Sequence, residues 1–137
     1  MKGSINVAKY YYPAIFTEEE FGYSIRFPDL DGCFTEGETL DEAYKMAVDA
    51  IGLYLQQQDG KFSFPIGSNP KQIEADDNEF IALIEFDEME YLKKHEKKSV
   101  KKTLTIPSWL NSQAENANAP FSRILQEGLI EFLGVRR

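Results

Sequence analysis

Residues 100–106 read Val-Lys-Lys-Thr-Leu-Thr-Ile and decide how the C-terminal part of the chain is interpreted. In an extended chain, successive side chains point to opposite faces. The resulting apolar face carries Val100, Leu104 and Ile106, and the polar face carries Lys101, Thr103 and Thr105. This alternation, together with the β-branched residues, predicts one short strand.

Two helices are predicted after this strand. Pro107 and Ser108 are typical of a helix start, so the first helix is expected over residues 109–118. Pro120 interrupts the pattern, and a second amphipathic helix is expected from Phe121. Its apolar positions recur at three- and four-residue spacing: Phe121, Ile124, Leu125, Gly128, Leu129, Phe132 and Leu133.

A lone strand followed by two short helices is too small to bury its own apolar faces, so this unit is expected to pair with a second copy. Two strands pairing antiparallel would form a two-stranded ribbon packed on the helices. The expected dimer core consists of Leu104, Ile106, Leu125, Leu129 and Phe132.

Such a ribbon fits the major groove of B-DNA, which predicts a DNA-binding surface. Lys101, Thr103 and Thr105 would face the base edges from both copies. The free amides at the start of the second helix, near Ser122 and Arg123, are expected to hold a backbone phosphate.

The N-terminal part predicts an α+β fold, with an antiparallel sheet and one main helix. Strand patterns at residues 10–16, 23–27 and 33–36 indicate a three-stranded meander. Thr39 and Glu42 form a capping-box pattern that predicts a helix from residue 40 to about 55. The apolar run at residues 80–86 is expected to be the most buried strand, followed by a short helix over residues 87–92.

The net charge of −8 conceals a division of the chain into an acidic and a basic part. Residues 1–92 contain 6 Lys+Arg and 19 Asp+Glu, a net charge of −13, whereas residues 93–137 contain 9 and 4, a net charge of +5. We therefore expect an N-terminal domain over residues 1–92, a basic linker over 93–99 and a C-terminal domain over 100–137. Such asymmetry indicates separate partners, one of them polyanionic.

The composition argues against several other classes of protein. One cysteine and one histidine are too few for a classical zinc site, so no metal or other cofactor is expected. No apolar run has the length of a membrane span or of a signal peptide, and the protein is expected to be cytoplasmic.

Two residue groups raise the question of catalysis. Asp29 and Asp31 could be paired magnesium ligands of a nuclease, but solvated carboxylates in a turn are the preferred interpretation, and no catalytic residue is assigned. Cys33 has no evident histidine partner because His95 lies in the charged segment, so it is expected to be a buried, unreactive hydrophobe.

Both parts of the chain resemble known modules. Residues 101–107, with Trp109-Leu110 and residues 121–125, resemble a ribbon-helix-helix DNA-binding unit. The N-terminal part resembles the N-terminal domain of HicB-family type II antitoxins. The motifs that carry this second resemblance are Tyr12-Pro13-Ala14, Gly22-Tyr23, residues 27–33, Thr35-Glu36-Gly37 and residues 39–43.

The resemblance implies a partial ribonuclease-H-like N-terminal domain without an active site. It would bind and mask a small, basic, HicA-like toxin that cleaves messenger RNA, while the C-terminal dimer represses the protein's own operon. The expected toxin contacts are Tyr23, Phe27, Asp29, Asp31 and Phe34. Two alternatives are a metal-dependent nuclease built on the N-terminal domain, and a plain ribbon-helix-helix transcription factor with a sensing or oligomerising N-terminal domain.

Overall fold

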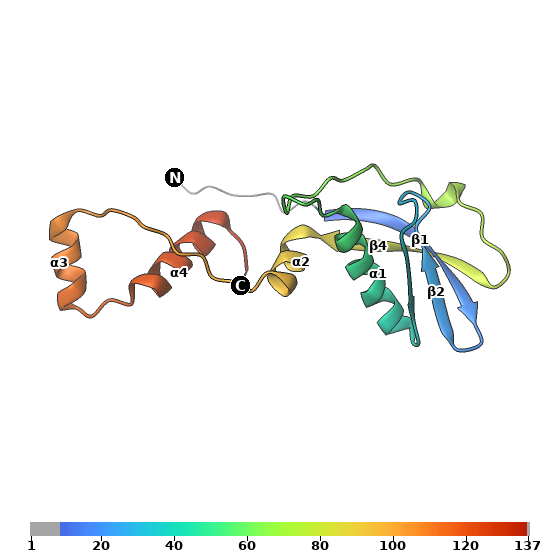
Figure 1. The fold of residues 1–137 in the computed structure, drawn as a ribbon, viewed down its shortest axis with the longest axis horizontal. Coiled ribbons are helices and arrows are strands. Elements are labelled where there is room, and N and C mark those ends of the chain that lie inside the picture. Colours follow the sequence, from blue (N-terminus) through green and yellow to red (C-terminus); the bar gives the residue numbers. More distant parts are fainter. Residues whose placement is uncertain (1–8, 137) are drawn as a thin grey trace. The chain divides into compact units, whose positions relative to one another are not determined.

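The computed structural model describes residues 9–136, which form two compact units. The first, called the head, comprises residues 9–97, and the second, called the tail, comprises residues 98–136. Together they give an α+β protein with one antiparallel sheet (Figure 1). Each unit is described by itself.

The sheet of the head has four antiparallel strands in the order β3-β2-β1-β4. Strands β1 (Lys9–Glu19), β2 (Gly22–Arg26) and β3 (Phe34–Gly37) form the predicted meander. Strand β4 (Glu79–Asp87) returns along the other side of β1, with Tyr12 opposite Ile84. Between α1 and β4, a 3-10 helix, η1 (Pro70–Gln72), lies in the long connection.

Helix α1 (Leu40–Leu55) packs on one face of the sheet, as Figure 1 shows. It starts where the capping pattern predicts, because the Glu42 amide donates to the Thr39 hydroxyl at 3.1 Å. Its buried residues meet the apolar side of the strands to form the core of the head. The core includes Ala43, Ala47, Ile51, Tyr12, Phe16, Ile25, Ile84 and Phe86.

The expectation that residues 80–86 form the most buried strand is wrong. Strand β4 lies at the edge of the sheet, and only Ile84 and Phe86 of its nine residues are buried. Strand β1 is covered on both sides by strands and is buried continuously from Tyr12 to Phe16. A run of apolar residues indicates a strand but does not reveal its place in the sheet order.

Helix α2 (Glu88–His95) follows β4 and extends three residues into the predicted linker. It approaches α1 at Gly52, where an added Cβ atom would lie 2.0 Å from the Tyr91 ring. The Tyr91 ring is buried against Phe62 and Phe86, and it contacts the His95 ring at a tilt of 31°. Lys93, Lys94 and His95 therefore belong to a helix of the head, not to a free linker.

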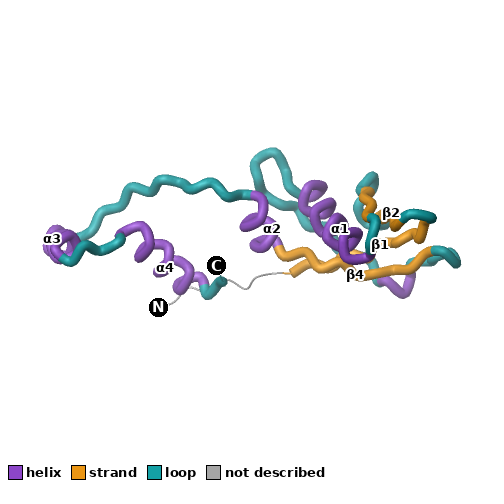
Figure 2. The backbone as a smooth tube through the Cα atoms, turned by 90° about the horizontal axis from the view of Figure 1, so that it is seen from below, coloured by secondary structure: helices purple, strands orange, loops and turns teal. Residues whose placement is uncertain are grey.

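The tail contains two helices, α3 (Ser108–Asn116) and α4 (Phe121–Leu133). Their starts agree with the sequence pattern to within a residue. The predicted strand over residues 100–106 is not formed in the single chain, where this segment is an extended loop (Figure 2). A strand requires a neighbour for its backbone hydrogen bonds, and the tail of one chain offers no second strand within residues 98–136.

Candidate functional site

The turn that follows β2 holds two of the predicted toxin contacts, and they differ in exposure. The Asp29 carboxylate accepts hydrogen bonds from Ser68, one from the amide at 2.9 Å and one from the hydroxyl. Asp29 therefore fastens this turn to the long connection between α1 and β4. Asp31 is exposed and remains accessible to a partner.

The three aromatic residues predicted to contact the toxin lie in different environments. Phe27 is only 4% exposed and belongs to the core, so its assignment as a surface contact is wrong. The reason is the two-residue period of the strand, which places Phe27 on the same side as Ile25, facing α1. Tyr23 is half-buried, with its ring edge against Phe16 and Phe80.

Phe34 is the most accessible of the predicted toxin contacts. Its side chain is 70% exposed, and it lies opposite Arg26 in the ladder between β2 and β3. Phe34 and Asp31 are thus exposed and remain candidate toxin contacts. Phe27 is buried, and the Asp29 carboxylate is hydrogen-bonded to Ser68 within the head.

An acidic surface lies where the β1–β2 hairpin meets the start of α1. Two adjoining hollows there, of about 270 and 320 Å³, are lined mainly by carboxylates. The acidic residues are Glu18, Glu19, Glu36, Glu38 and Glu42. The sequence shows these glutamates as separate groups, and only the hairpin and the β3–α1 connection bring them together.

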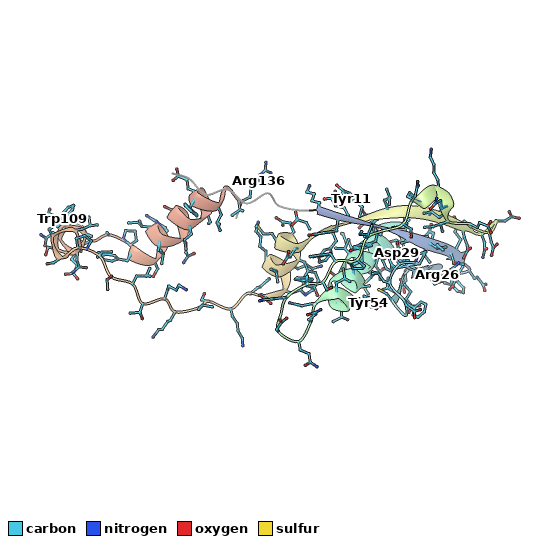
Figure 3. The ribbon with its side chains drawn as sticks, turned by 90° about the horizontal axis from the view of Figure 1, so that it is seen from above. Tyr11, Arg26, Asp29, Tyr54, Trp109 and Arg136 are labelled. Carbon is cyan, nitrogen blue, oxygen red and sulfur yellow. The ribbon has the colours of Figure 1, made fainter. Side chains whose placement is uncertain are left out.

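A polar cluster on the sheet was also missed by sequence reasoning. Arg26 donates to Glu79 at 2.6 Å, and Thr17 donates to the same carboxylate at 3.0 Å (Arg26 is labelled in Figure 3). These hydrogen bonds, with one from the Asp76 amide, lower the pKa of Glu79 to about 2. The cluster joins β1, β2 and β4 through side chains.

Of the two carboxylates considered as magnesium ligands, Asp29 bonds Ser68 and Asp31 is exposed. Two other aspartates of the head have cationic partners: Asp41 pairs with Lys45 at 3.1 Å, and Asp49 pairs with Lys94 at 3.2 Å. Within residues 9–136, no group of three or more His, Cys, Asp or Glu side chains is arranged to hold a metal ion. Among these residues the structure thus identifies no ligand set for magnesium.

Cys33 is buried as predicted. Burial raises the pKa of its thiol to about 11, which keeps it protonated and poorly nucleophilic at neutral pH. Its sulfur lies 3.7 Å from the Ala50 carbonyl of α1. The Cys33 side chain therefore packs between the turn after β2 and helix α1.

The residues predicted to bind DNA are all exposed in the tail. Lys101, Thr103 and Thr105 lie in the extended segment before α3, and Ser122 and Arg123 lie in the first turn of α4. Pro120 is the N-cap of α4 and supplies no side-chain hydrogen bond to the amides of that turn. Arg123 lies 3.7 Å from Glu127, one turn along the helix.

Most apolar residues of the tail are exposed as well, and the others are half-buried. No residue of the tail between 98 and 136 is buried in the single chain. The predicted dimer core, consisting of Leu104, Ile106, Leu125, Leu129 and Phe132, is between 37% and 59% exposed. Trp109 on α3 is likewise exposed (Figure 3). An apolar face of this extent in so small a unit indicates an interaction surface.

The structure thus has two modules, an acidic head with its own core and a basic tail with no buried residue between 98 and 136. Residues 11–127 match the family of HicB-like antitoxins of bacterial toxin-antitoxin systems. The chain belongs to this family, and the resemblance to HicB-family antitoxins seen in the sequence is confirmed.

Solved structures and a curated protein are similar to this chain. A chain of a toxin–antitoxin complex from Streptococcus pneumoniae is 26% identical, with a TM-score of 0.55 over 89% of this chain and 97% of that chain. The antitoxin HicB of Burkholderia pseudomallei is 20% identical, with a TM-score of 0.47 over 89% and 95%. An uncharacterised 14.9 kDa protein of Haemophilus phage HP1 is 38% identical over 45 residues, which cover 33% of this chain and 34% of that relative.

The helices within residues 9–136 do not meet the requirements of a membrane span. None of them is both long enough and apolar enough to cross a bilayer.

Proposed function

We propose that this protein binds and masks a small, basic, HicA-like toxin through its head and represses its own operon through its tail. The tail would bind promoter DNA as a dimer. The observation that carries the proposal is that charge and burial divide the chain at nearly the same place. The acidic part has a complete core, whereas the basic part has no buried residue between 98 and 136.

The acidity of the head supports a basic partner. A toxin that cleaves messenger RNA needs a positively charged surface for its substrate, and a carboxylate-rich surface on the antitoxin attracts that same surface. The glutamates lining the hairpin hollows, together with Asp31, supply the negative charge. This complementarity would act mainly on the association rate and on the choice of partner.

The exposed apolar residues of the tail support a dimer. Pairing two copies of residues 100–106 would satisfy the backbone groups on the facing edges of both extended segments and cover Leu104 and Ile106 with the helices. The same pairing would place Lys101, Thr103 and Thr105 of both copies on one face, where a ribbon contacts the major groove. Ser122 and Arg123 would then hold phosphates.

Co-expression with the product of the adjacent reading frame tests the head. We expect a small basic protein that co-purifies with the full chain and whose RNA cleavage stops when the chain is added. Charge reversal at Glu18 and Glu19 is expected to slow capture at low salt, with reversal at Glu115 of the tail as the control. Failure of the adjacent product to bind would overturn the masking role.

Two other functions give different results. A metal-dependent nuclease would cleave labelled RNA when magnesium is added to the purified chain, and Asp31→Ala would abolish the cleavage. A plain transcription factor would bind DNA but would have no toxin encoded beside it. We infer a non-enzymatic protein acting in the cytoplasm, where messenger RNA and promoter DNA are both found.

A further inference from the structure

We propose that the outer edge of β4 receives an extended basic segment of the toxin, which adds to the head as a fifth strand. This inference rests on the proposed function, because it identifies where and how the toxin is held. It differs from the contacts expected in the sequence, which lie around the turn after β2. Its basis is the hydrogen bonding of β4.

The backbone groups of alternate β4 residues point away from β1. The Leu83 carbonyl accepts from the Tyr44 hydroxyl at 3.3 Å, and the Glu85 amide donates to the same hydroxyl at 3.2 Å. Because backbone groups in a strand alternate between its two edges, those of Ile81 point outward as well. We find no partner for the Ile81 amide and carbonyl within residues 9–136.

The Tyr44 hydroxyl hydrogen-bonds to one carbonyl and one amide on the outer edge of β4, as the backbone of a neighbouring strand would. The outward backbone groups of β4 are therefore accessible to hydrogen-bonding partners. At the other end of the strand, the Glu79 amide bonds the Asp76 carbonyl at 2.9 Å. The unoccupied part of the edge is therefore short and is centred on Ile81.

A cleft of about 580 Å³ lies between α1 and α2 at the Glu85–Asp87 end of β4, where an added strand that extended past Tyr44 would reach it. Its apolar lining includes Tyr44, Val48 and Tyr91, and Glu85 and Asp87 of β4 lie on its border. Side chains of an added strand would have this space beside the backbone pairing. In strand addition, the open backbone groups of an edge give affinity, and a pocket further along the same edge gives specificity.

The charge of β4 favours a basic occupant over a second copy of this chain. Glu79, Glu85 and Asp87 are its only charged residues, and two β4 strands paired antiparallel would bring acid toward acid. Arg26 already pairs with Glu79 and Lys9 with Glu85, so Asp87 is the β4 carboxylate left to attract a basic segment. The lysines around the cleft add no excess positive charge, because each is paired with a carboxylate. Lys9 pairs with Glu85, Lys45 with Asp41, and Lys94 with Asp49.

The remaining surface of β4 suits a partner that is partly apolar. Leu83 is 47% exposed and Ile81 is half-buried, so the strand presents apolar side chains between its acidic ends. Protected edge strands commonly carry lysine, proline or a bulge, and β4 has none of these within its nine residues. Nothing in its own sequence therefore prevents pairing at Ile81.

The test uses the full chain and the toxin encoded by the adjacent reading frame. Ile81→Pro removes the outward amide, a change that an edge strand tolerates, and Ile81→Val keeps the amide as the matched control. We expect Ile81→Pro to weaken toxin binding about tenfold, the equivalent of one or two hydrogen bonds, and Ile81→Val to bind normally. Amide hydrogen exchange of the unmodified chain should slow at Ile81 and Leu83 when the toxin is added.

The outcomes separate this inference from the proposed function. If the toxin binds but exchange at Ile81 and Leu83 is unchanged, the edge proposal is wrong and the masking role stands. This readout needs no variant, so it remains decisive if Ile81→Pro fails to fold. If exchange at Ile81 slows as the concentration of this protein is raised without any toxin, a second copy occupies the edge and the proposal is overturned. A toxin that does not bind at all would overturn both.

Discussion

The head and the tail are similar in apolar patterning but differ in what the single chain does with it. In the head, apolar residues of β1, β4 and α1 meet to form a buried core. In the tail, helix α4 has the most regular apolar spacing of the chain, yet none of its residues is buried. The apolar pattern therefore predicts which face of a helix or strand will be buried. Whether residues of the same chain can bury that face depends on the size of the domain.

The difference also explains the distribution of charge. A unit with its own core can carry a large net charge on its surface, because burial of apolar side chains stabilises it independently. A basic unit that forms its core only by dimerising brings the positive charges of two copies together. Their repulsion costs free energy unless a polyanion neutralises them. The acidic head and basic tail are thus consistent with two partners bound in different ways.

The largest expected effect contrasts two phenylalanines. Phe86 is fully buried in the head, and Phe86→Ala is expected to lower the free energy of unfolding by about 3–5 kcal/mol. Phe132 is 48% exposed on α4, so Phe132→Ala should act only where the tail is paired. Urea unfolding at two protein concentrations measures both, and only the Phe132→Ala effect should change with concentration.

This contrast fails if the two variants behave alike. An equal, concentration-independent loss of stability would mean that the tail is completed within one chain. The tail would then not require the second copy that the proposed DNA-binding dimer depends on.

The next effect concerns the polar face of the extended segment. Thr103→Ala and Thr105→Ala are each expected to weaken operator binding by about 1–3 kcal/mol for every base that the side chain reads, in both copies of the dimer. Toxin binding should be unchanged, because the head is not altered. A mobility-shift assay measures the affinity, with Thr35→Ala in the head as the control. Unchanged affinity for the operator would contradict the ribbon in the major groove.

The same comparison shows what the sequence could predict. The capping box at Thr39, the period-two strand of β2 and the helical spacing from Phe121 are local signals, and the corresponding elements occur where they predict. The partner of β4 was not predictable, because pairing with β1 joins residues about 70 positions apart in the chain. The burial of Phe27 could have been predicted, since it shares the parity of Ile25.

The candidate site was less predictable than the fold. Asp29 looked like an accessible carboxylate because its partner, Ser68, lies 39 residues later in a loop without a pattern. The cluster of Arg26 and Glu79 likewise joins two segments that the sequence keeps 53 residues apart. Surface chemistry in this protein depends on long-range pairing, for which one sequence contains little signal.

A smaller effect is expected from Arg123 at the start of α4. If it binds a phosphate, Arg123→Ala should weaken binding to operator and random DNA to a similar extent. The slope of log affinity against log salt should become shallower by about 0.9 for each phosphate that the variant no longer neutralises. Arg136→Ala removes the same charge elsewhere in the tail and serves as the control. An equal change in slope for both variants would indicate a general charge effect and not a specific interaction.

The smallest expected effect lies in the head and concerns its response to acid. The pKa of Glu79 is lowered to about 2 by hydrogen bonds from Arg26, the Asp76 amide and Thr17, whereas an unfolded glutamate titrates near 4.5. A lowered pKa in the folded state means that the ionised carboxylate stabilises the head above about pH 4.5, and that this stabilisation is lost as the pH falls toward 2.

Glu79→Gln should therefore be less stable than the unmodified chain at pH 7, and the difference should shrink in acid. Unfolding measured from about pH 7 to about pH 2, with Glu20→Gln at the exposed hairpin turn as the control, gives the comparison. A difference that stays constant over this range would mean that Glu79 acts through packing, and the side-chain link between β1, β2 and β4 would not depend on its charge.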